Sequence, residues 1–381
     1  MVAAAHVGKV PPSIPSIFDT LGATLRQAGW LLSMVNLTAA LGGMVLALTV
    51  DRLGHRRLVI LGSGLAAAAS LLAAWADSTA QLLVGRFFEG LGFIIVTVSV
   101  PTLVLRTARP ADRQRAMTFW TAYMPAGAGS MMLVAAALLP STSWRAVWLV
   151  AGALSLLMFA ALLLWALPRR ELDPLPAVRR PILHEVREVA TAPGPLAIAL
   201  CFGAYASCWF AIVGFLPTLQ VERLGFSSAT AAIVTAAVTI ANVGGNLATG
   251  WLLHRGAPRG LVIAAAAVSM AFCAAGVFVD GVPDPVRLGL AVVYSAVIGV
   301  VPGALFTGVP VHSPRPELVG ASTGLLMQGS NIGGLVGPPI TGALVAAGGW
   351  PAAAWLTSVA LGLVALAGLF LHRQERRRLR P

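Results

Sequence analysis

Charged residues are scarce in this chain of 381 residues. Asp, Glu, Lys and Arg together make up only 10% of it, whereas soluble domains carry roughly a quarter. Hydrophobic residues make up 57%, and the mean hydropathy is +0.84. This composition excludes a soluble globular enzyme and favours a bundle of membrane helices. The 40 glycines and 25 prolines fit such a bundle, because small residues allow close helix contacts.

Cysteine and the common catalytic motifs are also scarce. Cys201, Cys208 and Cys273 lie in apolar runs with neither a CxxC pair nor a histidine cluster beside them, which argues against a disulfide framework or a metal site. The chain has no Gly-Lys-Ser/Thr phosphate loop, no HExxH and no GxSxG. We therefore expect neither an enzyme nor a nucleotide-driven pump, and no cofactor or metal.

Apolar runs long enough to span a membrane are frequent. There are eleven of them, at residues 29–50, 58–76, 81–105, 116–139, 146–167, 196–219, 227–253, 261–279, 287–311, 319–347 and 351–371. Residues 1–18 are apolar but short. We interpret them as the second half of a twelfth helix, truncated because the start codon was placed too far downstream.

The basic residues are distributed unevenly between the two sides that twelve helices would define. One side receives twenty arginines, and the other receives four, which are Arg26, Arg145, Arg223 and Arg287. The positive-inside rule then predicts a multi-pass protein of the bacterial inner membrane with both termini in the cytoplasm. The net charge of +12 is explained by this bias and by attraction to the anionic lipid of the bilayer, so no nucleic-acid partner is expected.

The two halves of the chain resemble each other. Residues 25–65 align with residues 228–268, with Asp51-Arg52 on His254-Arg255 and Arg56 on Arg259. Parallel half-repeats of this kind are typical of transporter folds.

We therefore predict two six-helix bundles with a linker between them. The predicted parts are an N-terminal bundle at 1–167, a cytoplasmic linker at 168–195 with an amphipathic piece at 182–189, a C-terminal bundle at 196–371 and a basic tail at 372–381.

The loop at residues 51–57 reads Asp-Arg-Leu-Gly-His-Arg-Arg. It resembles the signature of the major facilitator superfamily, which is Gly, three residues, Asp-Arg, one residue, Gly and two basic residues. Ala47 replaces the leading glycine, while in the second half Gly250 keeps it and His254 replaces the acid. The resemblance implies an all-α membrane fold of twelve helices.

The resemblance also implies a conformational latch, formed by Asp51, Arg52, Gly54 and Arg56 and, in the second half, by Gly250 and Arg255. The acid of the motif can accept hydrogen bonds from a helix N-terminus or an arginine and so hold one conformation. The alternative is a charged turn that only fixes topology.

A second motif begins at Arg86 and reads Arg-Phe-Phe-Glu-Gly-Leu-Gly. It is similar to the family's Arg, two residues, Gln-Gly, one residue and Gly, with Glu89 in place of Gln. Arg86 and Glu89 share a helix face, and a charge at membrane depth costs about 2.5–3.5 kcal/mol, so both should face a cavity or a partner. We predict substrate or proton handling, and Glu89 is the leading proton carrier. A mutually neutralising structural pair is the alternative.

A third motif lies in the predicted span 319–347. From Gly333 to Gly342 it is close to the Gly-x-x-x-Gly-Pro-x-x-Gly pattern that antiporters of the superfamily carry on helix 5. Helix 5 of this chain instead has Tyr123-Met124-Pro125-Ala126-Gly127. We therefore predict that these glycines serve helix packing.

Polar residues inside the other spans complete the candidate site. Lys9 stands out because it is the only lysine among 26 basic residues. With Arg86 and Glu89 it gives a formal charge of +1, which favours an organic anion or zwitterion as substrate. The remaining candidates are His6, Tyr123, Tyr205, Asn242, Gln328 and Asn331, for which interhelical hydrogen bonding is the alternative.

The residues and the resemblance together predict a monomeric secondary transporter that moves a small solute by alternating access, coupled to protons. Within the superfamily it loosely resembles bacterial carriers for cyanate or nitroimidazole. A proton-driven multidrug exporter is an alternative of the same class. A transporter-like receptor that binds its ligand without moving it is an alternative of another class.

Overall fold

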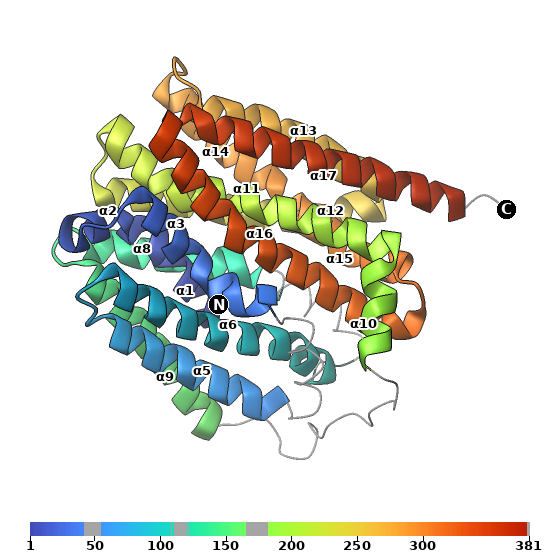
Figure 1. Cartoon of the computed structure of the whole chain (residues 1–381), viewed down its shortest axis with the longest axis horizontal. Coiled ribbons are helices and arrows are strands. Elements are labelled where there is room, and N and C mark those ends of the chain that lie inside the picture. Colours follow the sequence, from blue (N-terminus) through green and yellow to red (C-terminus); the bar gives the residue numbers. More distant parts are fainter. Residues whose placement is uncertain (42–54, 108, 110–119, 121, 165–181, 379–381) are drawn as a thin grey trace. The chain divides into compact units, whose positions relative to one another are not determined.

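The computed structural model describes residues 1–41, 55–107, 109, 120, 122–164 and 182–378, and these residues form helices without any strand (Figure 1). Within these ranges, eight helical stretches are long and apolar enough to cross a membrane. They are His55–Ala73, Thr79–Val100, Trp144–Leu164, Pro193–Leu224, Ser228–His254, Arg259–Phe278, Asp284–His312 and Pro351–Arg377.

The chain falls into two compact units, and the first consists of Met1–Ala177 and Val213–Ile240. Its described helices up to residue 164 are α1 (Val2–Gly8), α2 (Val10–Leu21), α3 (Leu25–Ser33), α5 (His55–Ala73), α6 (Thr79–Thr107), α8 (Tyr123–Leu138) and α9 (Trp144–Leu164). Helix α5 packs along α6 and α9, and α1 packs against α8, α9 and α6. These contacts bring α1, α5, α6 and α9 together around the candidate site.

The second unit consists of Val178–Ile212 and Ala241–Pro381. Its helices are α10 (Ile182–Thr191), the first part of α11 (Pro193–Leu224), the last part of α12 (Ser228–His254), α13 (Arg259–Phe278), α14 (Asp284–Ile298), α15 (Val300–His312), α16 (Val319–Gly348) and α17 (Pro351–Arg378). Helix α13 packs along α17 and α14.

The predicted spans coincide with helices wherever the chain is described, with three differences. The described part of the span 29–50 contains the 3-10 turn Met34–Asn36, which follows α3. The span 287–311 is divided into α14 and α15 at Gly299, where a Cβ would lie 2.2 Å from the carbonyl oxygen of Asn242. Helix α16 forms over the span 319–347, although it is not among the eight stretches above. Its glycines and its polar Ser, Asn and Gln residues lower its mean hydropathy. The amphipathic piece predicted at 182–189 is α10.

Helix α1 and helix α2 meet at Lys9, where the first predicted helix is interrupted. Pro11 and Pro12 occupy the first turn of α2. Neither has an N–H group, so neither can donate the hydrogen bond that would continue α1. The sequence therefore places the lysine at a local break in the helix.

Glycines allow α16 to approach α11 closely. A Cβ on Gly333 would lie 1.9 Å from the carbonyl oxygen of Gly203, and one on Gly329 would lie 2.2 Å from that of Ala199. The Ser207 hydroxyl donates a hydrogen bond of 3.0 Å to the carbonyl of Gly333. Backbone therefore meets backbone, as the packing role predicted for this motif requires.

Gly333→Ala is expected to lower the free energy of unfolding by about 1–3 kcal/mol, because the added methyl group would overlap a backbone oxygen that no side-chain rotation can move. Thermal unfolding of the purified protein in detergent measures this. Gly289→Ala in α14 is the matched control, since a Cβ there meets nothing within 4 Å, and it should stabilise the helix slightly. Equal unfolding temperatures for the two variants would contradict the packing role.

Candidate functional site

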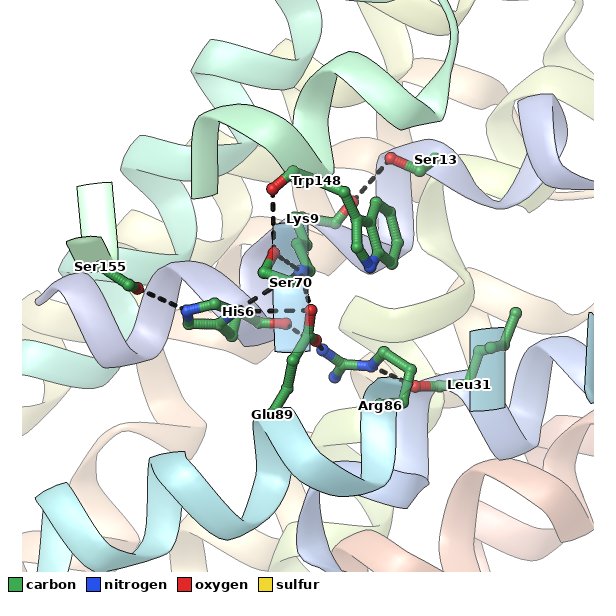
Figure 2. Close-up of polar contacts among 9 residues, drawn as sticks. All are labelled: His6, Lys9, Ser13, Leu31, Ser70, Arg86, Glu89, Trp148 and Ser155. Atoms are coloured by element: carbon green, nitrogen blue, oxygen red, sulfur yellow. Dashed lines mark hydrogen bonds and ion pairs between the residues drawn. The ribbon is translucent and has the colours of Figure 1, made fainter. Parts of the chain in front are cut away.

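Four ionisable side chains meet in the interior of the first unit (Figure 2). His6 belongs to α1, Lys9 lies at the break between α1 and α2, and Arg86 and Glu89 belong to α6. All four residues are 0% exposed. Burial at this depth is expensive for charged groups unless they pair with one another, so their mutual geometry decides what the cluster can do.

Each oxygen of the Glu89 carboxylate has its own cationic partner. The Lys9 ammonium donates to Oε1 at 2.5 Å, and the Arg86 guanidinium donates to Oε2. Nδ1 of His6 is 3.8 Å from Oε1. The pairing of Arg86 with Glu89 confirms the shared helix face predicted from their spacing. With a neutral imidazole, the cluster has a formal charge of +1.

Lys9 is held by two further contacts besides Glu89. Its ammonium donates a hydrogen bond of 2.7 Å to the Ser70 hydroxyl of α5 and lies 4.4 Å from the centre of the Trp148 ring of α9. Ser70 in turn donates to the carbonyl of Trp148 at 2.9 Å. Cation–π contacts of this kind stabilise a desolvated ammonium by about 2 kcal/mol. The lysine therefore has partners other than the carboxylate.

Arg86 connects three helices through backbone carbonyls. Its Nη1 donates to the carbonyl of His6 at 2.8 Å, and its Nε donates to that of Leu31 at 3.2 Å. Both carbonyls lie near an end of regular α-helix, the first before the break at Lys9 and the second before the 3-10 turn Met34–Asn36. Arg86 thus has a structural role in joining α1, α3 and α6 in addition to its pairing with Glu89.

His6 connects the cluster to a cavity. Its Nε2 forms a hydrogen bond of 2.7 Å with the Ser155 hydroxyl, and its Nδ1 is 3.5 Å from the Lys9 ammonium. Ser155 also lines a small cavity of about 10 Å³, together with Val2, Ser63, Gly92, Phe93 and others. A continuous series of polar groups therefore runs from the cavity through Ser155, His6 and Lys9 to Glu89.

The structure brings the other predicted site residues into different contacts. In the first unit, the ring of Tyr123 stacks on that of Trp120, with centroids 5.4 Å apart. In the second unit, the rings of Tyr205 and Phe202 are 5.3 Å apart.

The predicted amides lie in the second unit, where Asn242 and Asn331 form hydrogen bonds. The Asn242 amide donates to the carbonyl of Ser295 at 3.2 Å and accepts from Asn246 at 2.7 Å. The Asn331 amide donates to the carbonyl of Met327 at 2.7 Å. Gln328 is half-buried on the same helix, α16. Four of the nine predicted substrate and proton residues, His6, Lys9, Arg86 and Glu89, form one cluster within the first unit.

Sequence reasoning missed Ser70, Trp148 and Ser155, which hold Lys9 and His6 in place. Serine is common inside membrane helices, where its hydroxyl ordinarily bonds to the backbone of its own helix. Trp148 lies one turn after Trp144 in an apolar run. Nothing local distinguishes these three residues from others of their kind, and their partners lie in distant parts of the chain.

Three of the six residues predicted to form the latch belong to a segment that the structure does not describe. Asp51, Arg52 and Gly54 lie outside the described residues. Arg56 is half-buried in the first turn of α5.

The second-half latch residues lie at the end of α12. A Cβ on Gly250 would meet nothing within 4 Å. The guanidinium of Arg255 lies over the ring of Trp251, 4.0 Å from its centre. Arg259, which aligns with Arg56, donates to the carboxylate of Glu375 in α17 at 2.5 Å.

Comparison with known proteins identifies relatives along nearly the whole chain. The family model described as Major Facilitator Superfamily matches residues 1–327. The 3-(3-hydroxy-phenyl)propionate transporter of Escherichia coli K12 is 24% identical over 93% of this chain and 87% of its own. Human monocarboxylate transporter 11 is 26% identical over 94% of this chain and 77% of its own.

The fold also matches a solved transporter structure. A bacterial homologue of the human lysosomal transporter Spinster has a TM-score of 0.75 and 19% identity, covering 98% of this chain and 95% of its own. Three observations point to the same class of protein: the helices that could span a membrane, the matching family model and this fold. The chain therefore belongs to the Major Facilitator Superfamily and is a multi-pass membrane protein of the transporter class.

Proposed function

We propose that this secondary transporter moves a small organic anion together with a proton by alternating access. The observation that carries the proposal is the Glu89 carboxylate, which lies between Lys9 and Arg86 in a buried cluster of formal charge +1. The two relatives named above support the anionic class, because their names refer to carboxylates.

In the proposed mechanism the proton and the anion bind together. Protonation of Glu89 removes the negative charge that offsets one of the two cations Lys9 and Arg86, so the formal charge of the cluster rises from +1 to +2. A carboxylate of the substrate can then take over the two cationic partners. Ser70 and the Trp148 ring keep Lys9 in position meanwhile. The series from the cavity through Ser155 and His6 offers the proton a route.

The proposal includes the wider organisation predicted from the sequence. The chain would lie in the inner membrane of a bacterial cell with both termini in the cytoplasm. It would consist of bundles at 1–167 and 196–371, a linker at 168–195 and a tail at 372–381. The protein would act as a monomer, with the solute, protons and the lipid bilayer as partners and no nucleic acid.

Further residues are assigned roles within the same proposal. The latch would be formed by Asp51, Arg52, Gly54, Arg56, Gly250 and Arg255. Uncharged substrate contacts would come from Tyr123, Tyr205, Asn242, Gln328 and Asn331. The interactions of Tyr123 with Trp120 and of Asn242 with Ser295 are equally consistent with helix packing.

Accumulation in proteoliposomes tests the function. We expect radiolabelled 3-phenylpropionate or lactate to concentrate inside the vesicles when the outside is made acidic. When a protonophore removes the pH gradient, the solute should reach equal concentrations on both sides without accumulating. A thermal-shift screen of small carboxylates and hydrophobic cations beforehand selects the probe. Binding without accumulation would identify a receptor, and stabilisation by cations alone would identify a multidrug exporter; either outcome contradicts anion symport.

A further inference from the structure

One face of α17 is exposed and apolar along most of the helix. Trp355, Val359, Leu363, Leu366 and Phe370 form it, with exposed fractions from 41% to 78%. Their spacing of four, four, three and four residues keeps them on one side of the helix. In a membrane protein such a stripe faces the acyl chains of lipids.

The same face becomes cationic at its end. Arg373 and Arg377 follow Phe370 by three and seven residues, which continues the stripe, and Arg376 lies beside them. All three arginines are exposed, and the described side chains offer them no hydrogen bond or ion pair. The arginines therefore begin where the apolar surface of the helix ends.

The opposite face of this segment is fixed to the rest of the second unit. The Glu375 carboxylate accepts from Arg259 of α13 at 2.5 Å and lies 3.1 Å from the His312 ring of α15. The other ring nitrogen of His312 is 3.2 Å from the Gln374 amide oxygen. These contacts hold the last turns of α17 in a defined rotation and engage the Glu375 carboxylate.

We propose that Arg373, Arg376 and Arg377 bind the phosphate of an anionic phospholipid, such as phosphatidylglycerol. The apolar stripe directly before them accommodates the acyl chains, and the arginines lie at the level where acyl chains give way to headgroups. Guanidinium groups bind phosphate oxygens in pairs, which suits this headgroup better than the single point charge of lysine. A soluble phosphate would gain nothing from the stripe.

A lipid titration followed by native mass spectrometry tests the proposal. The purified full-length protein in detergent is titrated with phosphatidylglycerol and with phosphatidylcholine. We expect the wild type to prefer phosphatidylglycerol. The triple variant Arg373→Gln, Arg376→Gln, Arg377→Gln should bind it roughly 100-fold more weakly at low salt, since each basic residue near an anionic surface contributes about fivefold. Added salt should reduce the difference.

A second triple variant has the same change in net charge. Arg26, Arg57 and Arg109 are exposed in the first unit, and their replacement by Gln should leave the affinity unchanged. If both triple variants lost the same affinity for phosphatidylglycerol, the effect would come from net charge alone, and the proposed site would be overturned. Competition by inorganic phosphate as effective as that of the lipid, or equal affinity for phosphatidylcholine, would also overturn it. Unfolding temperatures measured without added lipid show whether each variant is folded.

Discussion

Glu89→Gln is expected to lower the free energy of unfolding by about 3–5 kcal/mol and to abolish accumulation driven by a pH gradient. The reason for the first effect is electrostatic: the formal charge of the buried cluster rises from +1 to +2, with Lys9 and Arg86 facing each other across a neutral amide. The reason for the second is chemical, because an amide cannot carry the proton. Thermal unfolding and proteoliposome uptake measure the two effects separately.

A second substitution separates folding from coupling in this variant. Adding Lys9→Met to Glu89→Gln returns the formal charge to +1 and should recover part of the lost stability without restoring proton-driven accumulation. Exchange of labelled for unlabelled solute at equal pH on both sides reports whether the folded carrier still moves. Undiminished accumulation by the Glu89→Gln protein would exclude Glu89 as the proton carrier.

Lys9→Met alone is expected to change stability by less than about 1.5 kcal/mol while removing stabilisation by organic anions. Arg86 and Glu89 remain as a neutral pair, and methionine fills a similar volume. Ser70 keeps its bond to the carbonyl of Trp148. The anion, however, loses one of its two cationic partners. The measurement is the thermal shift produced by the carboxylate that stabilises the wild type most.

Ser13→Ala is the matched control for Lys9→Met. The Ser13 hydroxyl donates to the backbone carbonyl of Lys9 at 2.7 Å, so its removal affects the same helix segment but not the ammonium. A thermal shift that survives in Lys9→Met, or disappears equally in Ser13→Ala, would remove Lys9 from the anion site.

Arg86→Ala is a less selective probe than its motif suggests. From the sequence one expects this variant to lose transport while expression stays intact. In the structure Arg86 also donates to the carbonyls of His6 and Leu31, so its loss would leave both buried oxygens without this partner. Expression and thermal unfolding should therefore be measured beside transport.

The class of protein and most of the helices follow from local composition. Runs of about twenty apolar residues predict spans whatever they pack against, and the broken first helix follows from Pro11 and Pro12. The pairing of Arg86 with Glu89 was also predictable, because residues three apart on a helix share a face. Each of these features depends only on neighbours within a few positions.

The completed site depends on contacts between distant spans. Lys9 and Glu89 are eighty positions apart, and Ser70, Trp148 and Ser155 reach the cluster from α5 and α9. In a bilayer the apolar pattern says little about how a helix is rotated, since lipid and protein interior are equally apolar. Close backbone approaches such as that of Gly8 to Ala128 set this rotation. The sequence by itself therefore determined the membrane class, the spans and the charged candidates, and only the tertiary structure decided which candidates meet.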